Sequence, residues 1–345
     1  MGRAGDTGES GASSALPAER VVVGLDVGGS KTHAILSVDG REVAEVKAGS
    51  ANLASVGVDA ADLQLRAIFS ELAGAHSSPA RVCAGVAGAD TEQARARFAA
   101  LLAAHVPHAR IDVVHDTELL LAAAGVEQGI ALIAGTGSVA WGRRDSPAGA
   151  GTSAPSREAR AGGWGYLLGD EGSGYWVVRA AVRHALDLVD QGRAPDALAQ
   201  ALAAACGVGG PEELLGHFYV RQERRYWAHH SHLVFELAES GDAAAHQIVT
   251  DTAAALTELV ARVASRLTLP DDAAPAPALP VVAAGGLVVH QPLLQRLIAS
   301  GLAAHGLRDV RVLENEPVHG AVRLAQRLEM PTDLAEERRK ENTCK

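Results

Sequence analysis

The stretch DVGGSKT at residues 26–32 combines two glycines with hydroxyl and amine side chains, between two apolar runs. Glycine lets a turn bend so that several backbone N–H groups point at one phosphate. Hydroxyl donors and a lysine strengthen such a site, and Asp26 could hold hydrated Mg²⁺ against the phosphates. The alternative is a plain hairpin with a glycine turn. As a nucleotide site, the turn would use Gly28, Gly29, Ser30, Lys31 and Thr32.

Two further glycine motifs favour a nucleotide site. IAGTGSVAW at residues 133–141 is a second turn of the same kind, which could grip the other end of a triphosphate. VVAAGGLV at residues 281–288 places two glycines where the backbone could approach an adenine ring or ribose. Each motif alone is a weak signal, whereas their order along one chain is fairly specific. The expected contacts are Gly135, Thr136, Gly137, Ser138, Gly285 and Gly286.

Asp116 ends an apolar run in the segment VVHDTE. Phosphoryl transfer needs a group that orients the attacking hydroxyl and accepts its proton. A carboxylate at the C-terminal end of a buried strand, facing a cleft, is well placed for that task. The alternative is an aspartate that caps the following helix.

The block AGGWGYLLGDEGSGYW at residues 161–176 is typical of a sugar site. Trp164 offers an apolar ring face, and the neighbouring Asp170 and Glu171 offer acceptors for hydroxyl groups. A core tryptophan and a pair of helix-capping carboxylates are the alternative. Without further information, the sequence predicts that Asn52 is a turn residue and that Asp90 caps the following helix.

The pattern of a strand, a glycine turn and a second strand occurs twice in the sequence. This repeat predicts two related α/β halves. Apolar runs predict strands at 20–27, 33–38, 42–48, 81–86, 110–115, 129–134, 139–143, 280–284 and 310–313. Helical spacing predicts helices at 59–73, 91–104, 117–124, most of 171–266, from about 292, and 318–328. The segments 146–160 and 271–279 are expected to be a mobile loop and a linker.

Composition narrows the class of protein. The chain has 345 residues, of which 48% are hydrophobic, so it can bury sizeable cores. A net charge of -10 disfavours a nucleic-acid partner. No apolar stretch reaches the length of a membrane span, and the first twenty residues, which include acidic side chains and lack an apolar core, are not expected to be a secretory signal. Cys83, Cys206 and Cys344 lack metal-ligand spacing, which fits a reducing cytoplasm.

The combined motifs resemble the sugar kinase/Hsp70/actin superfamily, and within it the N-acetylglucosamine kinase and BadF/BadG/BcrA/BcrD ATPase family. The block at 161–176 is similar to the GGWGxxLGDEGSxxW block of that family. VVHDTELLLAA, GTGSVAWG and EPVHGAVRLA also correspond to family segments, so the resemblance covers roughly residues 20 to 330. Val27 stands where several members have a glycine, and Ala161 where some have a cysteine.

The resemblance implies an α/β fold, namely a two-lobed actin-like ATPase (ribonuclease H-like) fold. Each lobe is expected to be a mixed sheet flanked by helices, with the active site in the cleft between the lobes. The expected organisation is a disordered tail at 1–19, an N-terminal lobe at 20–124, a C-terminal lobe with a helical insertion at 125–330, and a charged tail at 331–345.

The resemblance also implies the reaction, in which ATP with Mg²⁺ phosphorylates the 6-hydroxyl of N-acetylglucosamine. Asp116 is expected to be the base and the cytoplasmic enzyme to be a homodimer. The expected sugar contacts are Asn52, Asp90, Thr136, Gly163, Trp164 and Asp170. Alternatives are a kinase of glucosamine or another amino sugar, an activator ATPase of the BadF type, and a nucleotide-dependent sugar sensor. The activator branch carries an iron–sulfur cluster on paired cysteines, and this chain has no such pair.

Overall fold

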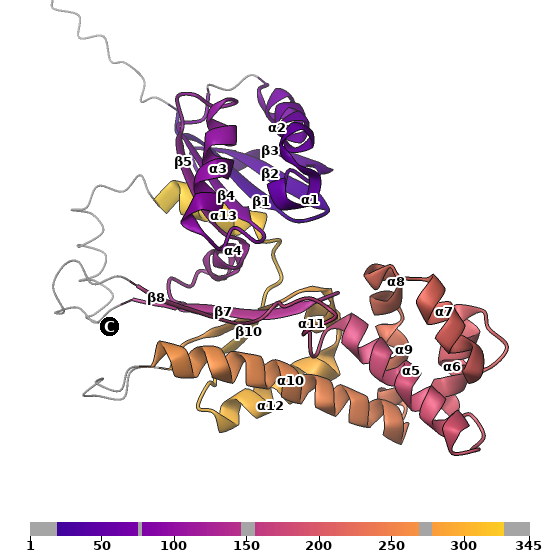
Figure 1. The fold of residues 1–345 in the computed structure, drawn as a ribbon. Coiled ribbons are helices and arrows are strands. Elements are labelled where there is room, and N and C mark those ends of the chain that lie inside the picture. Colours follow the sequence, from indigo (N-terminus) through magenta and orange to yellow (C-terminus); the bar gives the residue numbers. More distant parts are fainter. Residues whose placement is uncertain (1–18, 75–77, 146–155, 269–277, 328–345) are drawn as a thin grey trace, which may run out of the picture.

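A computed structural model describes residues 19–74, 78–145, 156–268 and 278–327. The predicted N-terminal and C-terminal tails, most of the predicted 271–279 linker and residues 146–155 of the predicted loop lie outside these described ranges. Two five-stranded sheets with flanking helices form two lobes, one above the other in Figure 1. None of the helices in the described ranges has the length and apolar character needed to span a bilayer.

The N-terminal sheet has the strand order β3-β2-β1-β4-β5. β1 pairs antiparallel with β2 and parallel with β4, so the first glycine turn is the hairpin between β1 and β2. Apolar side chains from the sheet pack beneath helices α2 and α3. The elements are β1 (Val21–Val27), β2 (Lys31–Val38), β3 (Arg41–Gly49), α1 (Leu53–Val56), α2 (Val58–Leu72), β4 (Arg81–Val86), α3 (Glu92–Ala103), β5 (Arg110–His115) and α4 (Asp116–Ala123).

The C-terminal sheet repeats this pattern in the order β8-β7-β6-β9-β10. β6 pairs antiparallel with β7 and parallel with β9, which confirms two related halves. Its strands are β6 (Gly129–Ala134), β7 (Ser138–Arg144), β8 (Arg157–Gly162), β9 (Val281–Ala284) and β10 (Val310–Val312). Its helices are α5 (Gly174–Asp190), α6 (Ala197–Cys206), α7 (Leu214–Val220), α8 (Arg224–His229), α9 (Ser231–Glu239), α10 (Ala243–Leu267), α11 (Gly286–His290) and α12 (Pro292–Ala304).

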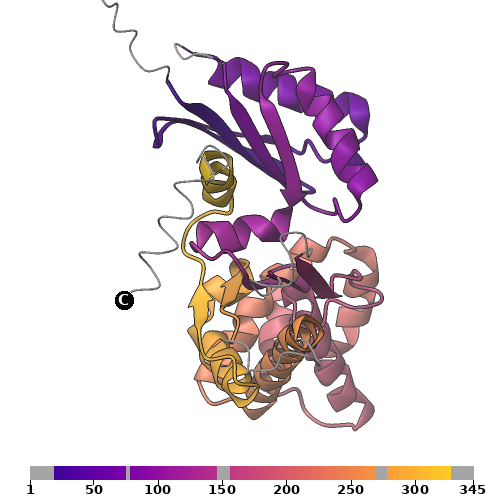
Figure 2. The same cartoon turned by 90° about the vertical axis from the view of Figure 1, so that its left-hand side faces the viewer.

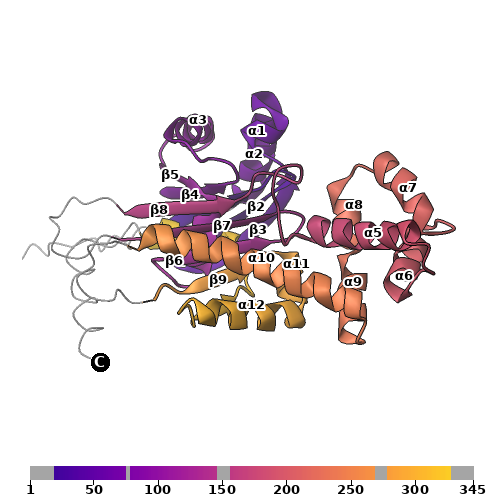
Figure 3. The same ribbon diagram turned by 60° about the horizontal axis from the view of Figure 1, so that its bottom comes forward.

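The helices α10 and α12 lie against the C-terminal sheet, whereas α6 to α9 extend beyond the end of the sheet (Figure 3). The helix starts follow local chemistry. The hydroxyl of Thr91 accepts from the Ala94 N–H and caps α3, as the sequence predicts. Asn52, Ser173 and Asp242 cap α1, α5 and α10 in the same way.

One local prediction was wrong. Residues 157–160, predicted to belong to a loop, open strand β8, because the edge of β7 offers its backbone groups for pairing. The helix predicted from about residue 292 is confirmed as α12, which begins at Pro292. The sequence analysis did not predict the short helix α11, which begins at Gly286 directly after β9.

The last helix, α13 (Val318–Arg327), packs under the N-terminal sheet (Figure 2). The chain therefore returns to the first lobe before residue 330, and the predicted assignment of 125–330 to the C-terminal lobe does not hold for α13. The apolar face of α13 covers β1 and β4. Its residues Val318 and Val322 are buried in one cluster with Val22 of β1 and Cys83 of β4. Together α13 and α4 form a helix pair between the two sheets.

The helix pair is closely packed through glycines. A Cβ at Gly320 would overlap the carbonyl of Leu119 in α4, and a Cβ at Gly24 would lie 2.5 Å from the Val322 nitrogen. A Cβ at Gly85 would overlap the Leu119 side chain. The three glycines therefore fix how closely α13, α4 and the N-terminal sheet approach.

We expect Gly320→Ala to lower the free energy of unfolding by about 3 kcal/mol, since the new methyl group must push α13 away from α4. In an open helix the same change is usually stabilising. Gly216→Ala in α7 is the matched control, because a Cβ there meets nothing within 4 Å. Urea denaturation of both variants measures the difference, and equal stabilities would show that the helix pair is loosely packed.

Candidate active site

A groove between the lobes brings the two predicted phosphate turns together. It is lined by Gly29 and Ser30 from the first turn, Thr136 from the second, Ser55, and residues 223–225. We call this set the phosphate groove. Turns that are more than 100 residues apart in sequence thus face one space, as a site for a triphosphate requires.

The first turn is a tight hairpin. The Gly28 N–H donates to the carbonyl of Lys31 at 3.0 Å, and Ser50 donates its hydroxyl to the Gly28 carbonyl at 2.8 Å. Thr32 does not reach the groove, because it is fully buried and its hydroxyl accepts from the Ala51 N–H at 2.8 Å. Its predicted role as a hydroxyl donor to phosphate is therefore replaced by a role in bracing the hairpin.

The second turn is held from behind by the predicted sugar-binding block. The Ser138 hydroxyl donates to the Glu171 carbonyl at 2.7 Å, and a Cβ at Gly137 would lie 3.0 Å from a carboxylate oxygen of Asp170. Asp170 is buried, and this burial raises its pKa above the usual range. Asp170 thus lies against the second turn, and Ser138 is turned away from the groove.

The third glycine motif lies beside the second turn. Gly285 has a φ of 93°, and a Cβ there would overlap the carbonyl of Ala134. A Cβ at Gly135 would lie 3.8 Å from the nitrogen of Gly286. Only glycine permits this crossing of β6 and α11, so the predicted nucleoside-binding segment lies against the start of the second turn.

Two carboxylates lie close together at one edge of the N-terminal sheet. Burial, followed by the negative charge of Asp116, raises the pKa of Asp26 to about 6, although Lys31 acts in the opposite direction. Asp26 ends β1, and Asp116 opens α4 at the end of β5, so the parallel strands bring them to one edge of the sheet. Two such anions close together favour a divalent cation between them and the phosphates.

A chain of polar contacts runs from Asp116 to the other lobe. His115 lies 2.9 Å from Asp116 through Nδ1 and 2.8 Å from Asp90 through Nε2. The second Asp90 oxygen accepts from Arg160 of β8 at 3.0 Å. Burial opposes a charge on His115, but its contacts with Asp116 and Asp90 prevail and raise its pKa. His115 therefore lies between the two aspartates, and its Nδ1 also contacts the Thr117 hydroxyl at 2.6 Å and accepts from the Thr117 N–H.

Asn52, Gly163 and Trp164 are further residues that were predicted to bind the sugar. Asn52 is buried; its side chain donates to the Ala87 carbonyl at 2.7 Å and accepts from the Ala54 N–H at 2.9 Å. It lines a hollow beside residues 86–89, next to Asp90. The Gly163 carbonyl accepts from Arg160 at 3.0 Å, and Trp164 is 70% exposed beside the same guanidinium. An exposed tryptophan next to polar groups is free to stack on a ligand.

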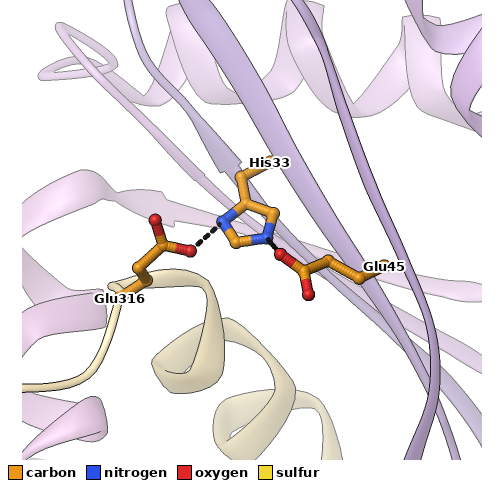
Figure 4. Close-up of side chains that lie close together, drawn as sticks. All are labelled: His33, Glu45 and Glu316. Carbon is orange, nitrogen blue, oxygen red and sulfur yellow. Dashed lines mark hydrogen bonds and ion pairs between the residues drawn. The ribbon is translucent and has the colours of Figure 1, made fainter.

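A second cluster of titratable groups lies beside the site (Figure 4). His33, across the strands from Asp26, lies 2.8 Å from Glu45 and 3.0 Å from Glu316. These three residues have the types that ligate metals, but the ammonium of Lys47 lies 3.0 and 3.2 Å from the two glutamates. The ammonium group of Lys47 thus occupies the position that a metal ion would need. The network connects β2 and β3 to the segment that leads into α13.

Sequence reasoning missed three contributors to the site, namely His115, Arg160 and Arg225. His115 directly precedes the predicted base, and Arg160 directly precedes the block at 161–176. Their positions next to these motifs could therefore have indicated a role in the site. Arg225 contacts Ser30, which lies 195 residues earlier in the chain, and no local sequence pattern links these two residues.

The paired sheets, the two facing glycine turns and the carboxylates at the cleft define a two-lobed ATPase of the actin-like fold class. A solved structure from Chromobacterium violaceum, assigned as an N-acetylglucosamine kinase, has the same fold, with a TM-score of 0.62 and 25% identity over 88% of this chain and 98% of that one. The sequence profile of the BadF/BadG/BcrA/BcrD ATPase family matches residues 23–325, and the chain belongs to this family.

Two curated relatives carry kinase names. The N-acetylmuramic acid/N-acetylglucosamine kinase of Clostridium acetobutylicum is 34% identical over 179 residues, which span 50% of this chain and 55% of that protein. The N-acetyl-D-glucosamine kinase of Dictyostelium discoideum is 26% identical over 317 residues, which span 87% of this chain and 92% of that protein.

The raised pKa of Asp26 predicts a pH-dependent cost of folding. The folded state binds this proton more tightly than the unfolded state, whose carboxyl has a pKa of 3.8, so stability falls as the pH rises through about 6. Without nucleotide, Asp26→Asn should raise the free energy of unfolding by on the order of 2 kcal/mol at about pH 8.

This gain should shrink to a small fraction toward about pH 4 and vanish below the unfolded pKa of 3.8, where Asp26 is protonated in both states. Urea denaturation at both pH values tests it, with Glu239→Gln, an exposed carboxylate at the end of α9, as control. A gain of equal size at both pH values would contradict the electrostatic cause.

Proposed function

We propose that this protein is an ATP-dependent kinase that transfers the γ-phosphate of ATP to the 6-hydroxyl of N-acetylglucosamine. The observation that carries the proposal is the position of Asp116. It lies at the start of α4, close enough to Asp26 to raise its pKa, where the two lobes meet. The names of the curated relatives support the class of substrate.

Asp116 would orient the sugar hydroxyl and accept its proton as the phosphate is transferred. Nδ1 of His115 lies 2.9 Å from one carboxylate oxygen of Asp116, and we assign the other oxygen as the one that accepts. Asp90 contacts Nε2 of His115, and Arg160 of the other lobe in turn pairs with Asp90. The base is therefore positioned in advance, which lowers the cost of reaching the transition state.

The nucleotide would lie in the phosphate groove, with its base and ribose beside Gly285 and Gly286. When bound, Mg²⁺ neutralises phosphate charge during transfer. The neighbouring carboxylates Asp26 and Asp116 fit such an ion, because their mutual repulsion is relieved by a divalent cation. Asp26 would hold the ion through water, and Lys31 adds a nearby positive charge.

The sugar would lie between Asn52 and Asp90 of the first lobe and Gly163 and Trp164 of the second. Thr136 lines the phosphate groove and Asp170 lies against the second turn, so we assign them the smaller part in sugar binding. One relative carries the name of an N-acetylmuramic acid kinase as well, which makes that sugar and glucosamine the alternative substrates. A cytoplasmic homodimer remains our expectation for the enzyme, to be measured by light scattering.

An activator ATPase with an iron–sulfur cluster is disfavoured. Cys83 is buried in β4 of the N-terminal sheet, and Cys206 is buried at the end of α6 in the other lobe. Within the described ranges these two thiols do not share a site, and Cys344 lies outside those ranges.

The reaction is tested by ADP release from Mg·ATP with N-acetylglucosamine, N-acetylmuramic acid, glucosamine, N-acetylmannosamine, glucose and no sugar. We expect sugar-dependent release, with the largest kcat/KM for N-acetylglucosamine. Asp116→Ala should lower kcat by roughly 1,000-fold or more, since it removes the base and its positioning. ADP release that ignores every sugar would refute the kinase and favour a partner-driven ATPase.

Trp164→Ala should raise the KM for the sugar about 10-fold and leave the KM for ATP unchanged, because the exposed ring faces the sugar side of the cleft. Initial rates at varied sugar and fixed ATP measure this effect. Tyr219→Ala, another exposed aromatic residue on α7, is the matched control. An unchanged sugar KM would remove Trp164 from the binding site.

A further inference from the structure

The phosphate groove receives a positively charged arm from the helical insertion. Residues 223–225, at the start of α8, line the groove together with Ser30 and Thr136. The Arg225 guanidinium donates to the Ser30 hydroxyl at 2.9 Å. This bond crosses the cleft, because Ser30 belongs to the N-terminal lobe and Arg225 to the insertion of the other lobe.

The residues next to Arg225 in the chain are firmly packed. Trp227, two residues after Arg225, is 1% exposed and packs on Phe218 with ring centroids 4.5 Å apart. Its indole N–H donates to the Arg221 carbonyl, and Tyr226 bonds to His217 at 2.7 Å. Arg225 is thus presented to the groove by an anchored turn of chain.

The two neighbouring arginines have different surroundings. Arg224 lies 5.4 Å from the ring of Tyr166, and its charge partly offsets the burial that raises the pKa of Asp170 behind the second turn. Arg225 instead points across the cleft at the first turn. A triphosphate between these turns would carry several negative charges, and the groove faces it with the two arginines 224–225 against the single carboxylate of Glu223.

We propose that Arg225 is a catalytic residue that binds the transferring γ-phosphate in place of the Ser30 hydroxyl when the lobes close on ATP. The inference rests on the proposed function for the reaction, but nucleotide binding alone can test it. A guanidinium matches phosphate oxygens in a bidentate geometry, and it stabilises the charge that spreads over these oxygens during transfer. Closure of the lobes would thereby be coupled to the chemistry.

The test compares binding of Mg·AMPPNP and Mg·ADP to the full chain by isothermal titration calorimetry. Arg225→Ala should weaken AMPPNP binding at least 10-fold and ADP binding less than threefold, because only AMPPNP carries the γ-phosphate. Arg225→Lys should retain part of the preference as a point charge. Arg221→Ala is the control: its guanidinium lies 5.5 Å from the Tyr226 ring in the same arm, and residue 221 does not line the phosphate groove.

In the sugar-dependent assay, Arg225→Ala should lower kcat about 100-fold with little change in the sugar KM. Equal loss of affinity for both nucleotides, or no loss, would overturn the inference. If the wild type binds AMPPNP selectively through Arg225 but accepts no sugar, the kinase proposal fails and the γ-phosphate role stands. If the wild type binds neither nucleotide, both proposals are wrong.

Discussion

The contact between α4 and α13 is the constraint on which the site depends. Gly320 lets α13 approach the Leu119 carbonyl, and Gly24 and Gly85 let the helix pair lie close beneath the N-terminal sheet. This packing places the first residue of α4, Asp116, beside Asp26 at the end of β1. The same pair of helices joins the lobes, so any relative motion of the lobes passes through it.

The electrostatic arrangement explains how an acidic protein can bind a polyanion. The net charge of -10 is a property of the whole surface, whereas a ligand responds to the groups around it. The phosphate groove is lined by the glycine turn at Gly29 and Ser30, by Thr136 of the second turn, by the arginines at 224–225 and by the carboxylate of Glu223. The carboxylates Asp26 and Asp116 are not among the lining residues. In the proposed reaction, a divalent cation would compensate these two charges.

Two polar contacts cross the cleft at different points. Asp90 pairs with Arg160 beside Asp116, the proposed base, and Ser30 pairs with Arg225 in the phosphate groove. Both contacts bridge the two lobes, so a movement of the lobes away from each other would break them. Closure that assembles the base and the phosphate contacts together would limit wasteful transfer to water.

The sequence by itself determined the two-lobed α/β fold, both glycine hairpins and Asp116 at a strand end, because turn chemistry and apolar periodicity act over a few residues. It placed α13 in the wrong lobe, left residues 157–160 in a loop and assigned Thr32 to the phosphates. Only the tertiary structure decided these points, and only it brought Arg225 to Ser30 and Arg160 to Asp90. These contacts follow from how α4 and α13 dock the lobes, which is a matter of packing between distant segments that no local pattern encodes.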